Sequence, residues 1–82
     1  MSKLKTTILS ILKPRTIGMY PNTLKDETII NMRGEIVTTG DFNTALAELK
    51  DLGYVKGFAD SFGDLTYTIT DAGRAACVAR GM

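Results

Sequence analysis

The side chains that most often perform catalysis or bind metals are scarce in this chain. It contains no histidine and only one cysteine, Cys77. The commonest general base is therefore missing, and a tetrahedral zinc site of nitrogen and sulfur ligands cannot be assembled. Neither phosphate-binding glycine motif, Gly-x-x-x-x-Gly-Lys-Ser/Thr or Gly-x-Gly-x-x-Gly, occurs. The sequence predicts a protein that is not an enzyme and that carries no metal or cofactor.

The thiol and the N-terminus indicate a compartment. Cys77 has no partner for a disulfide within the chain, which favours a reducing environment. We expect it to be a plain small side chain, because only Arg74 and Arg80 lie near enough in sequence to activate it. The first five residues are too polar for a signal peptide, and no apolar run approaches the roughly 20 residues that a membrane span needs. We therefore expect a cytoplasmic protein with no membrane partner.

The charged residues are distributed unevenly along the chain. The net charge is +1, but residues 1–40 hold six basic and three acidic side chains, whereas residues 41–82 hold four basic and six acidic ones. Four basic residues around the first predicted helix form a candidate basic patch: Lys3, Lys5, Lys13 and Arg15. The alternative interpretation is scattered charge that keeps the protein soluble.

The hydrophobic spacing predicts how these residues are positioned. Eighty-two residues, 44% hydrophobic and 23% charged, predict one globular domain over residues 1–82. The period of the apolar residues, with Pro14, Gly34 and Gly53 as breaks, predicts three helices. After Gly53 the period changes to two, which predicts an antiparallel hairpin and then a last helix. The expected helices are 2–13, 22–33, 39–52 and 71–80, and the expected strands are 54–59 and 65–70. The fold class is mainly α, a three-helix core with a β-hairpin.

The same spacing predicts what is buried. The third helix, with Thr39 or Asp41 as N-cap, presents an apolar arc of about 120°. The expected common core is Ile8, Leu12, Leu46, Leu49, Leu52, Val55 and Ile69. The connection between the first two helices is expected to pack through Ile17, Met19 and Tyr20. The last helix is expected to pack through an alanine face, Ala72, Ala75, Ala76 and Ala79, with Val78.

This order of elements resembles the winged helix-turn-helix superfamily. Bacterial regulators of the MarR and PadR type show a leucine-spaced helix, then Gly and two apolar residues that open the hairpin, or wing. Residues 45–55, Ala-Leu-Ala-Glu-Leu-Lys-Asp-Leu-Gly-Tyr-Val, follow that pattern, and residues 67–74, Tyr-Thr-Ile-Thr-Asp-Ala-Gly-Arg, resemble its closure. The chain is also similar to small phage-encoded winged-helix proteins at Thr38, Asp41, Phe42, Ala45, Leu46 and Leu49.

The resemblance implies a bacterial or phage transcriptional regulator that binds double-stranded DNA. In such proteins the third helix enters the major groove and the wing touches the backbone. The residues expected to face the groove are Asn43, Thr44, Ala47 and Asp51, with Lys50 at one edge. The DNA-binding candidates are then Asn43, Thr44, Ala47, Lys50 and Lys56. Asn43 could pair with adenine, and Thr44 could contact a phosphate or a thymine methyl group. A solvated helix face is the alternative, and a homodimer is expected because one small module binds DNA weakly.

The predicted hairpin loop suggests a second function. Phe62 lies between Asp60 and Asp64, with no basic residue in the loop. It is either packed under the hairpin or an exposed wing anchor. An exposed aromatic ring is a better anchor for a protein partner than for phosphate. The alternative function is a winged-helix protein-protein interaction module without DNA binding.

Overall fold

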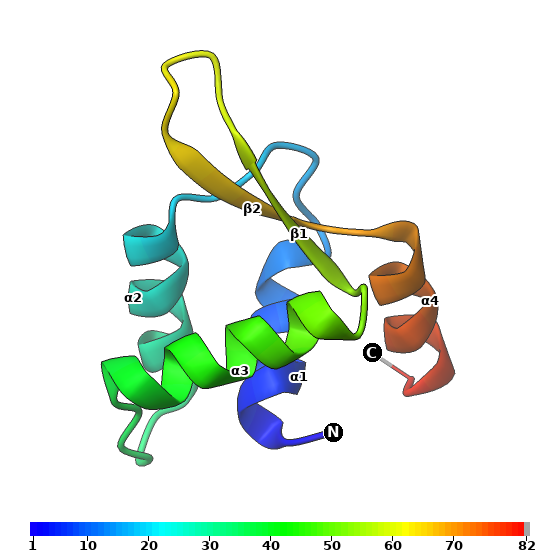
Figure 1. Cartoon of the computed structure of the whole chain (residues 1–82). Helices are drawn as coiled ribbons and strands as arrows, with labels where there is room; N and C mark the ends of the chain where they lie inside the picture. Colours follow the sequence, from blue (N-terminus) through cyan, green and yellow to red (C-terminus); the bar gives the residue numbers. More distant parts are fainter. Residues whose placement is uncertain (82) are drawn as a thin grey trace.

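The computed structural model describes residues 1–81, and its element order is the predicted one (Figure 1). The elements are α1 (Lys3–Leu12), α2 (Pro21–Asn31), α3 (Thr39–Asp51), β1 (Val55–Ala59), β2 (Leu65–Ile69) and α4 (Asp71–Ala79). The helices surround a common interior, and the β1–β2 hairpin, called the wing below, projects away from them. None of the helices in residues 1–81 is long and apolar enough to cross a membrane.

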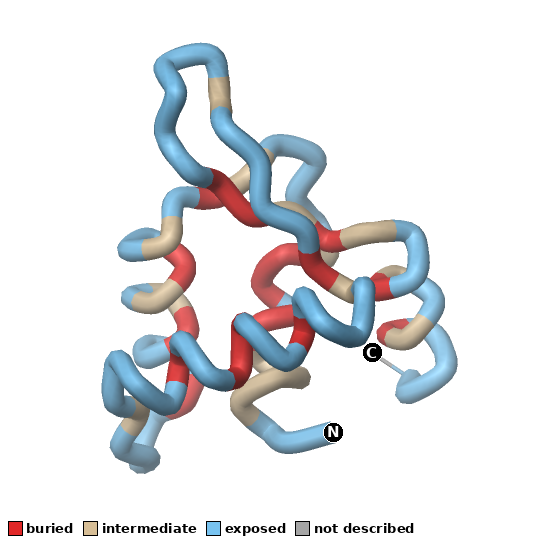
Figure 2. Tube along the Cα trace, in the orientation of Figure 1, coloured by how far each residue is buried: buried red, intermediate tan, exposed pale blue. Residues whose placement is uncertain are grey.

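The core forms where α1, α2 and α3 meet the base of the wing. Six of the seven predicted core residues are buried there, together with Leu9, Leu24 and Phe42 (Figure 2). Leu52 is the exception, with 54% of its surface exposed. It lies at the edge of the apolar arc and serves as the C-cap of α3, beyond the turns that face the core. The prediction that Leu52 is buried was wrong.

α3 is fixed at both ends by its sequence. Its N-cap is Thr38, so neither predicted cap, Thr39 or Asp41, was right. The Thr38 hydroxyl accepts a hydrogen bond from the amide of Asp41 at 3.0 Å. Asp41 reciprocates, since its carboxylate accepts the amide of Thr38 at 3.4 Å, which completes a capping box. At the other end Gly53 has φ +78°, a conformation that glycine adopts without a steric penalty. This turn directs the chain straight into β1.

The wing is an antiparallel pair in which Val55 lies opposite Ile69 and Ala59 opposite Leu65. On the outer side of β2, Met19 exchanges two backbone hydrogen bonds of 2.8 Å with Tyr67. The wing is thereby joined to the connection between α1 and α2. Met19 is buried as predicted, but Ile17 is 80% exposed and Tyr20 is 45% exposed, so the predicted packing of this connection was wrong at those two residues.

Burial does not alternate along β2, because Thr66 is buried as well as its neighbour Tyr67. The α1–α2 connection passes over Thr66 at Gly18, where a Cβ atom would lie 2.6 Å from the Thr66 hydroxyl oxygen. The connection therefore covers Thr66, while Phe58, its partner on β1, stays 42% exposed and Leu65 48% exposed.

α4 packs through a different face from the predicted one. Gly73 and Cys77 are its buried residues, while Ala72, Ala75, Ala79 and Val78 are exposed. At Gly73 a Cβ atom would lie 2.3 Å from the carbonyl oxygen of Tyr54, so only glycine lets the helix come this close to the base of the wing. The orientation of α4 is therefore set by the close approach of its backbone at Gly73 and not by the alanine face.

α2 differs from its prediction at both ends. It starts at Pro21 with Tyr20 as N-cap and stops at Asn31 with Met32 as C-cap. Proline suits the first helical position, because the amide that it lacks has no partner there. Asp26 and Glu27 therefore lie beyond its first turn.

Candidate nucleic-acid interface

One side of α3 faces solvent and carries two polar side chains, an alanine and a lysine. Asn43, Thr44, Ala47 and Lys50 are exposed, and they form what we call the reading face. The helical period puts Asn43, Thr44 and Ala47 away from the buried side of α3 and Lys50 at the edge of the exposed face. The capping box and the buried leucines hold the helix, so these side chains stand on a fixed support.

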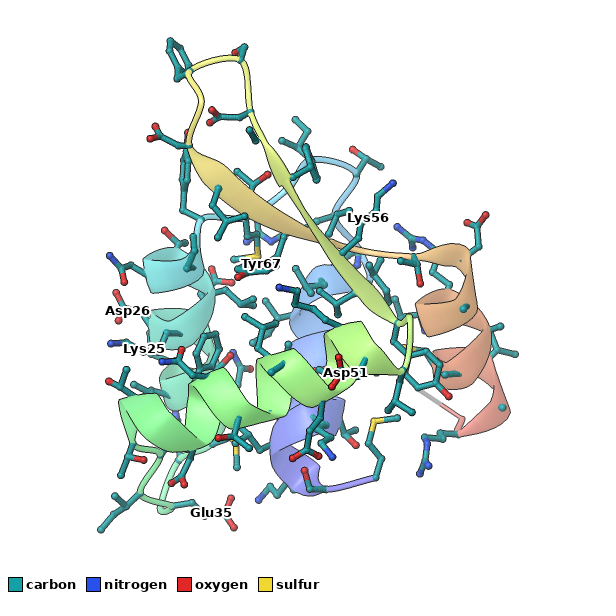
Figure 3. All side chains as sticks on the ribbon, viewed as in Figure 1. Lys25, Asp26, Glu35, Asp51, Lys56 and Tyr67 are labelled. Atoms are coloured by element: carbon teal, nitrogen blue, oxygen red, sulfur yellow. The ribbon has the colours of Figure 1, made fainter. Side chains whose placement is uncertain are left out.

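The acidic residues of α3 are less available than a sequence count suggests. The carboxylate of Asp41 is used in the capping box, and Glu48 forms an ion pair with Lys5 of α1. Asp51 remains exposed at the C-terminal end of the helix (Figure 3). The reading face itself carries one cation, Lys50, whose ammonium nitrogen lies 5.6 Å from the centre of the Tyr67 ring in the wing. This distance is within the range of a cation–π contact.

A lysine of α2 also lies beside α3. The Lys25 ammonium donates to the hydroxyl of Thr39 in the first turn of α3 at 3.3 Å, and Figure 3 shows it beside that end of the helix. Lys25 is absent from the predicted site residues, because its position depends on how α2 packs against α3. The one feature of the sequence that could have indicated it is that Lys25 lies in the helix directly before α3.

The four residues of the candidate basic patch are distributed over several contacts. Lys3 pairs with Glu35 at 3.3 Å, Lys5 with Glu48, and Arg15 with Glu27 at 3.3 Å. Lys13 is the C-cap of α1. These ion pairs join α1 and its following turn to the rest of the molecule, and they offset part of the positive charge that the first half of the sequence carries.

The tip of the wing is organised around one carboxylate. Asp60 accepts the hydroxyl of Tyr20 at 2.6 Å through one oxygen, and the amides of Phe62 and Asp64 at 2.9 Å through the other. The Tyr20 hydrogen bond, and then the backbone amides, hold the pKa of Asp60 below its usual range, while the same bond raises the pKa of Tyr20. Phe62 is 84% exposed at this tip, so of the two positions expected for it the structure shows the exposed one.

Lys56 is exposed and extends from the wing on the side away from Tyr67 (Figure 3). It makes no ion pair or hydrogen bond with any other residue of 1–81. Lys50 and Lys56 therefore lie on different sides of the wing.

Solved structures share this arrangement. A MarR-family transcriptional regulator from Silicibacter pomeroyi matches 92% of the chain with a TM-score of 0.71 and 27% identity. A PadR-family transcription regulator from Clostridium difficile R20291 matches 98% of the chain with a TM-score of 0.78 and 19% identity. SSV1 F-93 matches 96% of the chain with a TM-score of 0.77 and 16% identity. The chain spans 46% of the first protein, 84% of the second and 82% of the third.

These likenesses, over nearly the whole chain, show that it has the winged helix-turn-helix fold. No protein-family model matches the sequence, and neither does any curated protein.

Proposed function

We propose that the chain is the DNA-binding module of a bacterial or phage transcriptional regulator acting in the cytoplasm. The observation that carries the proposal is the exposed reading face of α3, with its polar side chains and one cation, in a fold shared with transcriptional regulators. α3 would enter the major groove, with Asn43, Thr44 and Ala47 toward the base edges.

The residue types suit direct reading of bases. The amide of Asn43 offers a donor and an acceptor that match adenine, and the methyl groups of Thr44 and Ala47 suit thymine. Lys25 and Lys50 would contact phosphates beside the groove. Lys56 would have to reach the backbone from the other side of the wing.

The expected affinity of one copy is low. Phosphate contacts supply most non-specific affinity, and the ion pairs of Lys3, Lys5 and Arg15 leave few free cations for them. Two copies on adjoining half-sites would make up for this, as is usual for helix-turn-helix dimers.

The test is a fluorescence anisotropy titration with a pool of random duplexes at low salt, followed by selection of the bound sequences. Asn43→Ala is expected to cost about 1–3 kcal/mol on the selected site and to relax one base position. The matched control is Asn31→Ala, which removes an amide that donates to the carbonyl oxygen of Glu27 at the far end of α2. Equal losses in both variants, or no selected sequence, would count against this function.

A second function is favoured by the tip of the wing. The exposed ring of Phe62, with Asp64 beside it, is suited to a protein partner and repels phosphate. In an interaction module without DNA binding, Phe62→Ala would cost about 2 kcal/mol or more against that partner, and Asn43→Ala almost nothing.

A further inference from the structure

One face of the wing has opposite charge at its two ends. Because side chains alternate across a strand, Lys56 and Phe58 of β1 share a face with Asp60 and Asp64, whose backbones pair at 2.9 Å where the loop begins. Lys56 lies near the base of the wing, Phe58 in the middle and the aspartates at the tip. We call Lys56, Phe58 and Asp64, all exposed, the rear face.

Two grooves meet at Phe58. One, of about 490 Å³, is lined by three cations, Arg15, Lys56 and Arg74, with a single carboxylate, Asp71. The other, of about 360 Å³, runs between Phe58 and Ile17 toward Asp60. Apolar surface thus lies between a basic groove and an acidic tip.

This arrangement is complementary to itself. Lys56 lies two residues before Phe58, and the Asp60–Asp64 pair lies two residues after it. A two-fold axis passing by Phe58 would therefore bring Lys56 of one copy to Asp64 of the other, twice. A two-fold interface requires this kind of surface, because the same patch serves both partners.

The same two-fold rotation would bring Phe62 of one copy against the other copy. It lies four residues beyond Phe58, so antiparallel wings would carry it to the base of the other wing, where the basic groove lies. An aromatic ring placed among arginine and lysine side chains gains cation–π contacts as well as burial. Phe62, 84% exposed in one chain, would be covered in two.

We propose that the rear face binds a second copy of this chain, with the two wings antiparallel, Phe58 against Phe58 and Lys56 against Asp64. Tyr67, which lies beside Lys50 of the reading face, is on the other face of the wing, so α3 stays open in this dimer. The two wings are expected to associate whether or not α3 binds DNA, so the dimer is measured without DNA.

The test is sedimentation velocity over a concentration series of the whole chain. The wild-type protein is expected to form a dimer, and Lys56→Asp and Asp64→Lys are each expected to weaken it at least tenfold. Mixing these two variants is expected to restore dimers, because the Lys56→Asp chain then carries two acids against two lysines of its partner. Phe62→Ala is expected to weaken the dimer to a similar degree without any change of charge.

The controls are Arg33→Asp and Asp26→Lys, the same charge changes at exposed residues outside the rear face. Each control variant alone, and the two mixed, are expected to dimerise as strongly as the wild-type chain. Circular dichroism checks that every variant is folded. A wild-type chain that stays monomeric throughout the series would overturn the proposal. So would a dimer that resists both reversals, or a control mixture that associates as strongly as the test mixture.

Discussion

The reading face of α3 and the tip of the wing are each held by an aspartate that hydrogen-bonds to the nearby backbone. In α3, Asp41 binds the amide of Thr38, and in the wing, Asp60 binds the amides of Phe62 and Asp64. The supported surfaces differ, since α3 displays an amide, a hydroxyl and an ammonium group, whereas the wing displays an aromatic ring. The formal charge of each region therefore overstates its free negative charge, because the carboxylates of Asp41 and Asp60 are engaged in hydrogen bonds with the backbone.

The largest expected effect tests whether both surfaces depend on one core. Leu49→Ala is expected to lower the free energy of unfolding by about 2–5 kcal/mol, because it removes a fully buried side chain and leaves a cavity. Leu52→Ala, on the same helix but exposed, is expected to cost about 0.5 kcal/mol or less. Denaturation in urea measures both, and similar losses would mean that α3 is rotated from the orientation described.

The next prediction separates the two surfaces by their response to salt. If α3 binds DNA, Lys50→Gln is expected to weaken binding to all sequences alike and to reduce the slope of log K against log salt by about 1. Lys3→Gln, at a residue paired with Glu35, is the matched control and is expected to leave the slope unchanged. If Lys3→Gln changes the slope and Lys50→Gln does not, the DNA interface lies on α1 and not on α3.

A smaller effect concerns the wing alone. Tyr20→Phe removes the hydroxyl that binds Asp60 and is expected to speed hydrogen exchange at the amides of Phe62 and Asp64 several-fold. Amides of α3 are expected to keep their rates, since none of their bonds involves Tyr20. Tyr54→Phe is the control, and equal protection of the tip in both variants would show that the loop holds itself without Tyr20.

The smallest expected effect is a dependence on pH. The pKa of Asp60 is depressed in the folded chain, so its hydrogen bonds are fully present above the ordinary carboxyl pKa and are lost as pH falls through the depressed value. The amide shifts of Phe62 and Asp64 in an NMR titration are expected to follow that transition, with the reading face unchanged. A tip that titrates at the ordinary carboxyl pKa would contradict the Tyr20 contact.

Much of the fold could be predicted because several local signals agree. The apolar arc of α3, the turn at Gly53 and the alternation after it all point to a helix followed by a hairpin. The buried face of α4 could not be predicted, because a helix rich in alanine has no single apolar side and the close approach at Gly73 depends on Tyr54. For the site, exposure of the reading face follows from helical period alone. The pairing of Lys5 with Glu48 and the contact of Lys25 with Thr39 depend on how helices cross.

The buried thiol of Cys77 can serve as a natural probe of how often the structure opens around α4. It is the single cysteine of the sequence and is fully buried on the inner side of α4. A thiol reagent can reach it only when α4 lifts from the base of the wing or when the whole domain unfolds, so the labelling rate measures the frequency of such openings. Labelling that outpaces global unfolding would identify α4 as a separately opening segment, observed without any introduced probe.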